Sequence, residues 1–320
     1  MCLLVYLSKQ VRPLLHIPGS DNQLLRHKEK VVVVMGATGT GKSRLSIDLA
    51  TRFAAEVINS DKMQVYQGLD IATNKITDEE RRGVPHHLLG VVADPETDFS
   101  AGNFRAVASI SMRSILGRGH LPIIVGGSNS FVEALVDMNF QLRYDCCFLW
   151  VDVGMPVLHS FVSDRVDKMV ERGMIDEVRD FYRPNADYSR GIRRAIGVPE
   201  LDEFFRVESF CDDETRARIL AEAIDSIKSN TSRLSRRQLE KIHRLRNIKG
   251  WRMHRLDATD VFRKRGGEAE AAWENTVAGP GAALVSRFLY DMEPAPAVVC
   301  GGVAAAMRGV GRPLMATATH

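Results

Sequence analysis

The sequence lacks the patterns that mark several classes of protein. Its five cysteines are odd in number and form no C-x-x-C pair, which argues against a disulfide framework or zinc ribbon and for reduced thiols in an intracellular compartment. None of its nine histidines shows the spacing of a zinc finger or an H-E-x-x-H site. No apolar run approaches the roughly 20 residues that a membrane span needs, so we expect no membrane partner.

The sequence also has little excess of one sign of charge over the other. The 43 Lys and Arg residues against 40 Asp and Glu residues leave a net charge of +3. Such a mild excess gives no general field for nucleic acid, so an anionic partner must be held by a local basic cluster, and DNA is not expected to bind. A chain of 320 residues with 45% hydrophobic content suits one large or two modest domains with ample core.

The sequence does contain a phosphate-binding loop. Residues 31–43, VVVVMGATGTGKS, match the pattern G-x-x-x-x-G-K-[ST] through Gly36, Gly41, Lys42 and Ser43. The run before the loop predicts a buried strand, and the apolar spacing after it predicts a helix. Glycines let backbone N–H groups turn toward a diphosphate, Lys42 adds charge, and the Ser43 hydroxyl can bind Mg²⁺. The intervening loop residues expected to share in binding are Ala37, Thr38, Gly39 and Thr40.

A second polar turn follows about twenty residues later. In the stretch EVINSDKMQVYQGLDIATNK, residues 56–75, a short apolar strand ends at Ser60-Asp61. Ligands of an open α/β sheet bind beyond the carboxyl ends of its strands. Asp61 is therefore expected to face the diphosphate, with an N-cap or a Mg²⁺ ligand as alternative roles.

Further strand and helix patterns define the fold class. Residues 68–103 predict long loops with one short helix near 78–82, and His86-His87 predicts a loop or a strand start rather than a metal site. Residues 104–116 then show helical spacing, LPIIVGGS predicts a strand ending at Gly126-Gly127, and CCFLWVDV at 146–153 predicts another. Four strands separated mostly by helices predict a P-loop NTPase-like, doubly wound parallel sheet.

Beyond residue 156 the pattern becomes mainly helical. Helices are predicted near 158–170 and 213–230, and residues 228–255 carry ten Lys and Arg against the single acid Glu240. We interpret this run as an anion-facing surface, with a solvated helix face as the alternative. The predicted parts are an extension over 1–27, an α/β core over 28–155, a helical substrate region over 156–290 and a disordered tail over 291–320.

Several blocks together resemble the isopentenyltransferases that place a dimethylallyl group on the N6 amine of adenine. The blocks are GATGTGKS, NSDKMQVYQGLDIATNK, VPHHLLG, IIVGGSNSF, RVDKMVERGMIDEV, RGIRRAIGVPE and NTSRLSRRQLEKI, spread over about residues 28–290. CCFLWVDV, RGIRRAIG and DATDVF most resemble the plant adenylate isopentenyltransferases, which begin cytokinin synthesis. Bacterial and eukaryotic enzymes that modify tRNA are close relatives of that group.

The resemblance implies specific roles for the two turns. The loop would hold the diphosphate of dimethylallyl diphosphate as a leaving group, with Mg²⁺ as cofactor and catalytic contributions from Lys42 and Arg237. Thr38 would bond the oxygen between C1 and phosphorus, and Asp61 would accept a proton from the N6 amine. Lys228 and Arg237 would hold the diphosphate from its far side.

The resemblance also implies an acceptor site for an adenine nucleotide, ADP or ATP and possibly AMP. Its residues would be Ser60, Asp61, Gln64, Gly127 and Ser128, and Arg194 and Lys249 would bind the phosphates of the nucleotide. Two departures from the family pattern concern the segment that follows the Gly126-Gly127 turn. Phe131 stands where a tyrosine is expected, and VDMNFQLRYD is shorter and less acidic than usual.

Three other functions remain as alternatives. A tRNA dimethylallyltransferase is disfavoured because residues after 211 contain no Cys and His pairs with finger spacing and the net charge is mild. A P-loop small-molecule kinase would share the loop but transfer phosphate. A non-catalytic nucleic-acid-binding protein would leave Asp61 unexplained.

The first 27 residues favour a plastid location. They contain Lys9, Arg12 and Arg26 with no acid before Asp21, which is typical of an organelle-targeting extension. A disordered N-terminus and a cytoplasmic protein are the alternative.

Overall fold

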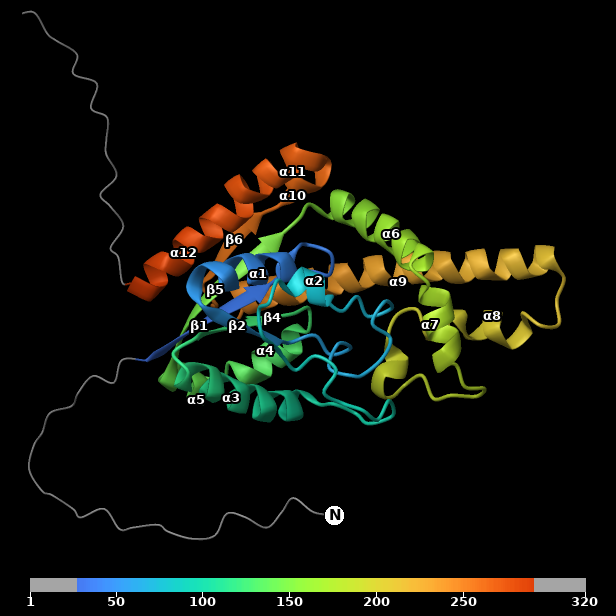
Figure 1. The fold of residues 1–320 in the computed structure, drawn as a ribbon, viewed down its shortest axis with the longest axis horizontal. Coiled ribbons are helices and arrows are strands. Elements are labelled where there is room, and N and C mark those ends of the chain that lie inside the picture. The colour runs from blue at the N-terminus through green and yellow to red at the C-terminus, as the bar shows by residue number, and fades with distance from the viewer. Residues whose placement is uncertain (1–27, 291–320) are drawn as a thin grey trace, which may run out of the picture.

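The computed structural model describes residues 28–290, so the predicted extension over 1–27 and tail over 291–320 lie outside the described residues. Figure 1 shows the arrangement of the elements. The strands are β1 (Glu29–Met35), β2 (Ala55–Asn59), β3 (His86–His87), β4 (Leu121–Val125), β5 (Tyr144–Asp152) and β6 (Met253–Asp257). The helices are α1 (Lys42–Phe53), α2 (Asp78–Arg81), α3 (Ala101–Gly117), α4 (Asn129–Leu135), α5 (Met138–Arg143), α6 (Met155–Glu171), α7 (Met174–Phe181), η1 (Gly191–Arg194), η2 (Pro199–Leu201), α8 (Asp202–Val207), α9 (Asp213–Asn247), α10 (Thr259–Arg263), α11 (Gly266–Trp273), η3 (Glu274–Ala278) and α12 (Gly279–Tyr290).

The six strands form one parallel sheet in the order β3-β2-β4-β1-β5-β6. Central β1 has a fully buried run, Val31 to Met35, as expected of a strand covered on both faces. The predicted parallel α/β fold is confirmed, with two more strands than the four predicted. β3 has only two residues, and the polar sequence MHRLD of edge strand β6 gave no strand signal.

Alternating side chains divide the core into two layers. Val31, Val33 and Met35 pack in the layer that contains α3, α4 and α9, whereas Val32 and Val34 pack in the layer that contains α1 and α12. This alternation follows from the two-residue period of a strand. The adjacent cysteines of β5, 146 and 147, likewise face opposite layers and are free thiols.

Helix α9 is one continuous helix of 35 residues, which corrects the prediction of a helix ending near residue 230 and a separate charged run. Buried residues recur at helical spacing beyond that point, at Thr231, Ser235, Gln238, Ile242 and Leu245. The run then leaves the helix after Asn247, and its last residues enter β6. The division at residue 155 stays a prediction, but β6 and α12 return from the second part to the sheet.

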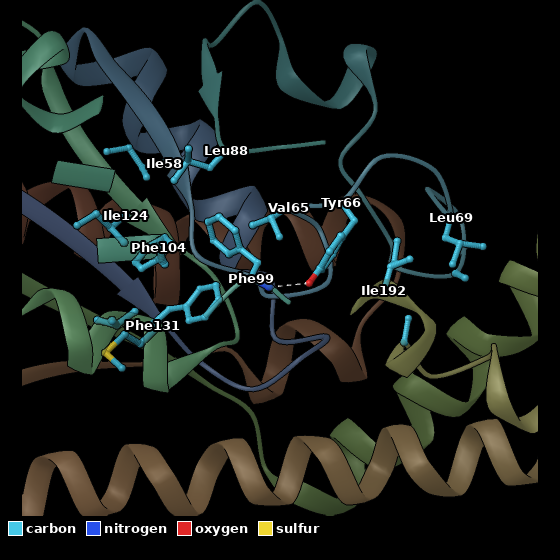
Figure 2. Packing of buried hydrophobic residues seen from close by; sticks show 14 of the residues in the cluster. Ile58, Val65, Tyr66, Leu69, Leu88, Phe99, Phe104, Ile124, Phe131 and Ile192 are labelled. Carbon is cyan, nitrogen blue, oxygen red and sulfur yellow. Dashed lines mark hydrogen bonds between the residues drawn. The ribbon is translucent and has the colours of Figure 1, made fainter. Parts of the chain in front are cut away.

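An aromatic cluster joins the loop after β2 to the segment before α3 and to helices α3 and α4. Figure 2 shows the Tyr66 hydroxyl accepting a hydrogen bond from the backbone N–H of Phe99, at 3.1 Å. Phe131 stacks on Phe104 with centroids 4.7 Å apart and meets Phe99 edge-on at 5.9 Å. Phe131 is 1% exposed, so the position where a tyrosine was expected serves packing in this chain.

A buried carboxylate ties β2 to its neighbours. Glu56 accepts hydrogen bonds from Arg118 at 2.7 and 3.0 Å, and its two oxygens lie 2.7 Å from His87 Nε2 and 2.8 Å from His120 Nδ1. Burial alone would raise the pKa of Glu56, but the hydrogen bonds from Arg118, His87 and His120 outweigh it and lower the pKa to about 2. The network joins β2 to β3 and to the turn after α3.

The first prediction concerns this network. Glu56→Gln should lower the free energy of unfolding by about 1.5–3 kcal/mol at pH 7, the usual scale for hydrogen bonds to a charged group. Because the folded pKa is depressed, the stabilisation is present above the ordinary value of 4.5 and is lost as pH falls from there toward about 2. Urea unfolding at pH 7 and pH 3.5 measures both effects. Glu171→Gln, at an exposed position of α6, is the matched control, and a deficit equal at both pH values would contradict the account.

Candidate functional site

A pocket of about 880 Å³ lies where the carboxyl ends of β1, β2 and β4 meet. Its walls come from the phosphate loop, the turn after β2, the Gly126-Gly127 turn after β4, helix α6 and the segment from α10 to α11. Parallel strands ending at one edge are the reason that turns far apart in sequence meet there.

The phosphate loop leaves the start of α1 open to an anion. Gly41 precedes the helix with φ at +92°, and a Cβ there would lie 2.8 Å from the ring of Trp273. Among residues 28–290, no side chain caps the first N–H groups of α1, so these donors and the positive helix end are available to a ligand. Inside the loop, the Ala37 carbonyl accepts from Lys42 Nζ at 2.6 Å and from Thr40 Oγ1 at 3.0 Å.

Lys42 has an unusual electrostatic environment. Burial lowers its pKa to about 8, the charge of Asp61 opposes the shift, and the charge of Arg165 adds to it. Burial also lowers the pKa of Arg165, again opposed by Asp61. Two desolvated cations therefore face one carboxylate, an arrangement that gains from a bound anion.

Asp61 is held by the strand end that carries it. Its backbone N–H donates to Asn59 Oδ1 at 3.0 Å, and its Oδ1 accepts from the Met63 N–H at 3.0 Å. A Cβ on Gly127 would lie 3.4 Å from the other oxygen, Oδ2, which accepts no hydrogen bond from residues 28–290. One carboxylate oxygen is thus fixed and the other is open to a ligand.

The turns after β2 and β4 are bonded directly to each other. The Ser128 N–H donates to the Ser60 carbonyl at 3.3 Å, and the Lys62 N–H donates to Ser128 Oγ at 2.8 Å. Ser60 Oγ is buried, and no described residue bonds it. The position of Asp61 is therefore tied to the glycine turn.

The structure brings most of the predicted site residues to this edge. Those that line the pocket are Thr38, Gly39, Gly41, Lys42, Ser43, Asp61, Gln64 and Gly127. Gly36, Ala37, Thr40, Ser60 and Ser128 belong to the same turns behind this lining. The Gln64 amide donates to the carbonyls of residues 73 and 74, at 3.1 Å each, and so holds another wall of the pocket.

Four predicted cations lie outside the pocket lining. Lys228 pairs with Asp167 at 2.6 Å, and Arg237 is exposed on α9. Arg194 pairs with Asp98 at 3.0 Å and Lys249 lies 3.9 Å from Glu133. Their expected roles at the diphosphate and the nucleotide stay predictions.

Sequence reasoning missed Arg165. Its guanidinium lines the pocket, donates to Thr38 Oγ1 at 3.0 Å and keeps a buried Nε without a partner among the described residues. It lies three residues after Val162 and four before Met169, on the buried face of α6. A cation at an apolar helix position was the signal in the sequence.

Sequence reasoning also missed Gln238. Its Oε1 accepts from the Thr38 N–H at 2.7 Å, and its Nε2 donates to the Gly127 carbonyl at 3.0 Å. Gln238 is a buried polar residue at a core position of α9. Buried polar side chains are normally hydrogen-bonded. A glutamine at this position therefore indicates a hydrogen-bond partner, but the sequence does not identify that partner.

Ser43 is the residue predicted to bind Mg²⁺ beside the phosphate loop. In the described part of the chain, no group of three or more His, Cys, Asp and Glu side chains is placed to hold a metal. Ser43 is an exposed residue of the pocket wall, and Mg²⁺ is usually held by few protein oxygens together with substrate phosphates and water. The donor set therefore fits an ion that arrives with a diphosphate.

The fold and pocket define a phosphate-loop α/β protein with a carboxylate facing its anion site. The chain belongs to the IPP transferase family, whose sequence profile matches residues 64–143 and 137–244. It is 62% identical over 271 residues to a chloroplastic adenylate isopentenyltransferase of Arabidopsis thaliana, covering 83% of this chain and 80% of that one. It is 47% identical over 296 residues to the adenylate isopentenyltransferase of Humulus lupulus, covering 81% and 90%.

Solved structures of tRNA-modifying enzymes share the fold. A eukaryotic dimethylallyltransferase acting on tRNA superposes with a TM-score of 0.71 and 25% identity, covering 83% of this chain and 80% of that one. A tRNA isopentenylpyrophosphate transferase of Bacillus halodurans gives 0.62 and 29%, covering 82% and 99%. The resemblance to the plant adenylate isopentenyltransferases is confirmed. Within residues 28–290, no helix is both long and apolar enough to span a membrane.

The second prediction concerns Lys42. Because its pKa is about 8, raising the pH from 7 to 9 neutralises most of the free protein's amine, and the affinity of wild type for inorganic diphosphate, divided by that of Lys42→Ala, should fall about tenfold. Calorimetry of wild type and Lys42→Ala at both pH values measures this. The titration of diphosphate itself affects both proteins equally, so it cancels in the ratio of wild-type affinity to Lys42→Ala affinity. Lys241→Ala, at an exposed position of α9, should behave as wild type. An equal ratio at pH 7 and pH 9 would show that Lys42 does not titrate in this range.

Proposed function

We propose that this chain transfers the dimethylallyl group of dimethylallyl diphosphate to the N6 amine of ADP or ATP, or of AMP, as the first step of cytokinin synthesis. The observation that carries the proposal is that the phosphate loop and Asp61 line the same pocket. In the reaction the C1–O bond of the donor breaks, a C1–N6 bond forms, the diphosphate leaves and an N6 proton passes to Asp61.

The loop side of the pocket suits a leaving group. Negative charge grows on the departing diphosphate as the C1–O bond breaks, and fixed donors that meet this charge lower the barrier. The donors are the N–H groups at the start of α1, Lys42 and Arg165. Bound Mg²⁺ would neutralise part of the same charge beside Ser43. Thr38 Oγ1 already accepts from Arg165, so its own proton is free to reach the bridging oxygen.

The carboxylate side suits the amine. An exocyclic adenine amine is a poor acid until its nitrogen bonds to carbon, so a positioned base acts as the bond forms. Asp61 offers Oδ2 while Oδ1 is held by the Met63 N–H. The acceptor site proposed around it uses the Gln64, Gly127 and Ser128 turns, which would position the ring.

The phosphates of the acceptor require cations beyond the adenosine, away from the reacting N6 amine. Burial lowers the pKa of Lys62, and the charge of the nearby Arg194 lowers it further. Two cations thus lie together beyond the Asp61 turn. Arg194 is our candidate for contacts beyond the α-phosphate, whereas Lys249 is placed beside Glu133.

A tRNA adenosine is the second candidate acceptor, because structures with this fold include tRNA-modifying enzymes. The free nucleotide is favoured because relatives of much higher identity are named adenylate isopentenyltransferases. Several of those relatives are named chloroplastic and one mitochondrial, which supports a plastid location as our proposal. Incubation with dimethylallyl diphosphate, Mg²⁺ and each of AMP, ADP, ATP and unmodified tRNA, read by mass, tests the assignment.

The third prediction tests the base. Asp61→Asn keeps the size of the side chain and should lower turnover by about a hundredfold or more, the scale of a lost general base, while dimethylallyl diphosphate still binds. Steady-state kinetics and calorimetry measure the two effects, with Asp180→Asn at an exposed site on α7 as the control. Turnover within a few fold of wild type would remove Asp61 from that role.

The fourth prediction tests the acceptor phosphates. A partly desolvated phosphate contact is worth roughly 1–3 kcal/mol, so Arg194→Ala combined with Lys249→Ala should lower the ATP-over-AMP ratio in kcat/KM by at least about tenfold. We expect Arg194→Ala alone to give most of the change, because Lys249 lies beside Glu133. The ratio is measured at fixed free Mg²⁺, and an unchanged ratio would place phosphate recognition elsewhere.

A further inference from the structure

One buried glutamine joins the two halves of the pocket. Gln238 of α9 accepts from the Thr38 N–H at 2.7 Å and donates to the Gly127 carbonyl at 3.0 Å. The residue is itself anchored, because its backbone carbonyl accepts from Asn129 Nδ2 at 2.9 Å. A side chain 200 residues from the phosphate loop therefore links that loop to the glycine turn.

The glycine turn bonded to Gln238 also lies beside Asp61. A Cβ on Gly127 would lie 2.5 Å from Gln238 Nε2 and 3.4 Å from Asp61 Oδ2. Gly127 thus lies between the glutamine amide and the carboxylate, with no room for a side chain. The two hydrogen bonds of Gln238 span the space between the Thr38 peptide and the turn that flanks Asp61.

We propose that Gln238 is a positioning residue that holds the leaving-group loop and the Asp61 turn at the separation that transfer to N6 requires. The proposal rests on the proposed function for its catalytic consequence. A bridging amide suits the task because its two ends offer one acceptor and one donor, which match an N–H on one side and a carbonyl on the other. Gln238 touches neither reacting atom and acts through Thr38 and Gly127.

Loss of this spacing should divert the reaction to water. If the amine is displaced when the C1–O bond breaks, a water oxygen bonds C1 instead, a water proton passes to solvent, and dimethylallyl alcohol and diphosphate are released. A displacement of about 1 Å can cost about a hundredfold in rate. Water that enters a loosened pocket faces no such constraint.

The experiment compares Gln238→Met with wild type and with Gln141→Met. Methionine has nearly the length of glutamine but makes neither bond, and Gln141 is exposed on α5. The measurements are kcat, the dissociation constant of dimethylallyl diphosphate, and the ratio of diphosphate released to dimethylallyl adenine nucleotide formed. We expect kcat to fall at least about tenfold and the ratio to rise several-fold, with donor affinity changed by less than about threefold. Gln141→Met should match wild type.

A purely structural role would give a different result. Partial unfolding lowers the active fraction, so it reduces transfer and diphosphate release equally and leaves their ratio unchanged. An unchanged ratio in Gln238→Met, or a kcat within twofold of wild type, would overturn the proposal.

Amide hydrogen exchange tests the link without activity. The Thr38 amide should be protected in wild type and exchange at least about tenfold faster in Gln238→Met. In Gln238→Glu it should stay protected, because a carboxylate still accepts from Thr38, but the product ratio should rise because the carboxylate cannot donate to the Gly127 carbonyl. Equal Thr38 exchange in wild type and Gln238→Met would overturn the link itself. If wild type transfers no dimethylallyl group, the proposed function fails while the exchange result still decides whether the link exists.

Discussion

The parallel pairing of β4 with both β1 and β2 is the constraint on which the pocket depends. Val125 of β4 lies opposite Val34 of β1 and Asn59 of β2. Because the three strands share this register, the phosphate loop, the Asp61 turn and the glycine turn leave the sheet at one level. The turns can then bond one another, and the pocket needs no rearrangement of the sheet to bring an anion site and a carboxylate together.

Electrostatics explain why this pocket suits two ligands of different kinds. Lys42 and Arg165 are desolvated beside Asp61, and each has its pKa lowered by burial. An anionic diphosphate would relieve the two cations, whereas Asp61 offers one open oxygen to a neutral amine. A group transfer between these ligands uses both ends at once, because charge leaves at the loop while a proton is taken up at the carboxylate.

The parts of the site that depend on local sequence could be predicted, and those that depend on long-range packing could not. The phosphate loop and Asp61 follow from a glycine pattern and a strand end, which are short-range signals. Arg165 and Gln238 lie on helix faces that otherwise pack in the core, so their roles appear only once α6 and α9 are placed against the loop. Strand β6 was missed for the same reason, since its polar sequence is a strand only beside β5.

A crystal structure of a ternary complex tests the central claim most directly. The donor would be dimethylallyl diphosphate with sulfur in place of the bridging oxygen, which slows the reaction, and the acceptor would be ADP with Mg²⁺. The account predicts the donor diphosphate on the loop beside Lys42 and Arg165, with the N6 amine about 3–3.5 Å from both C1 and Asp61 Oδ2. The phosphates of ADP bound in the loop, with adenine away from Asp61, would contradict it.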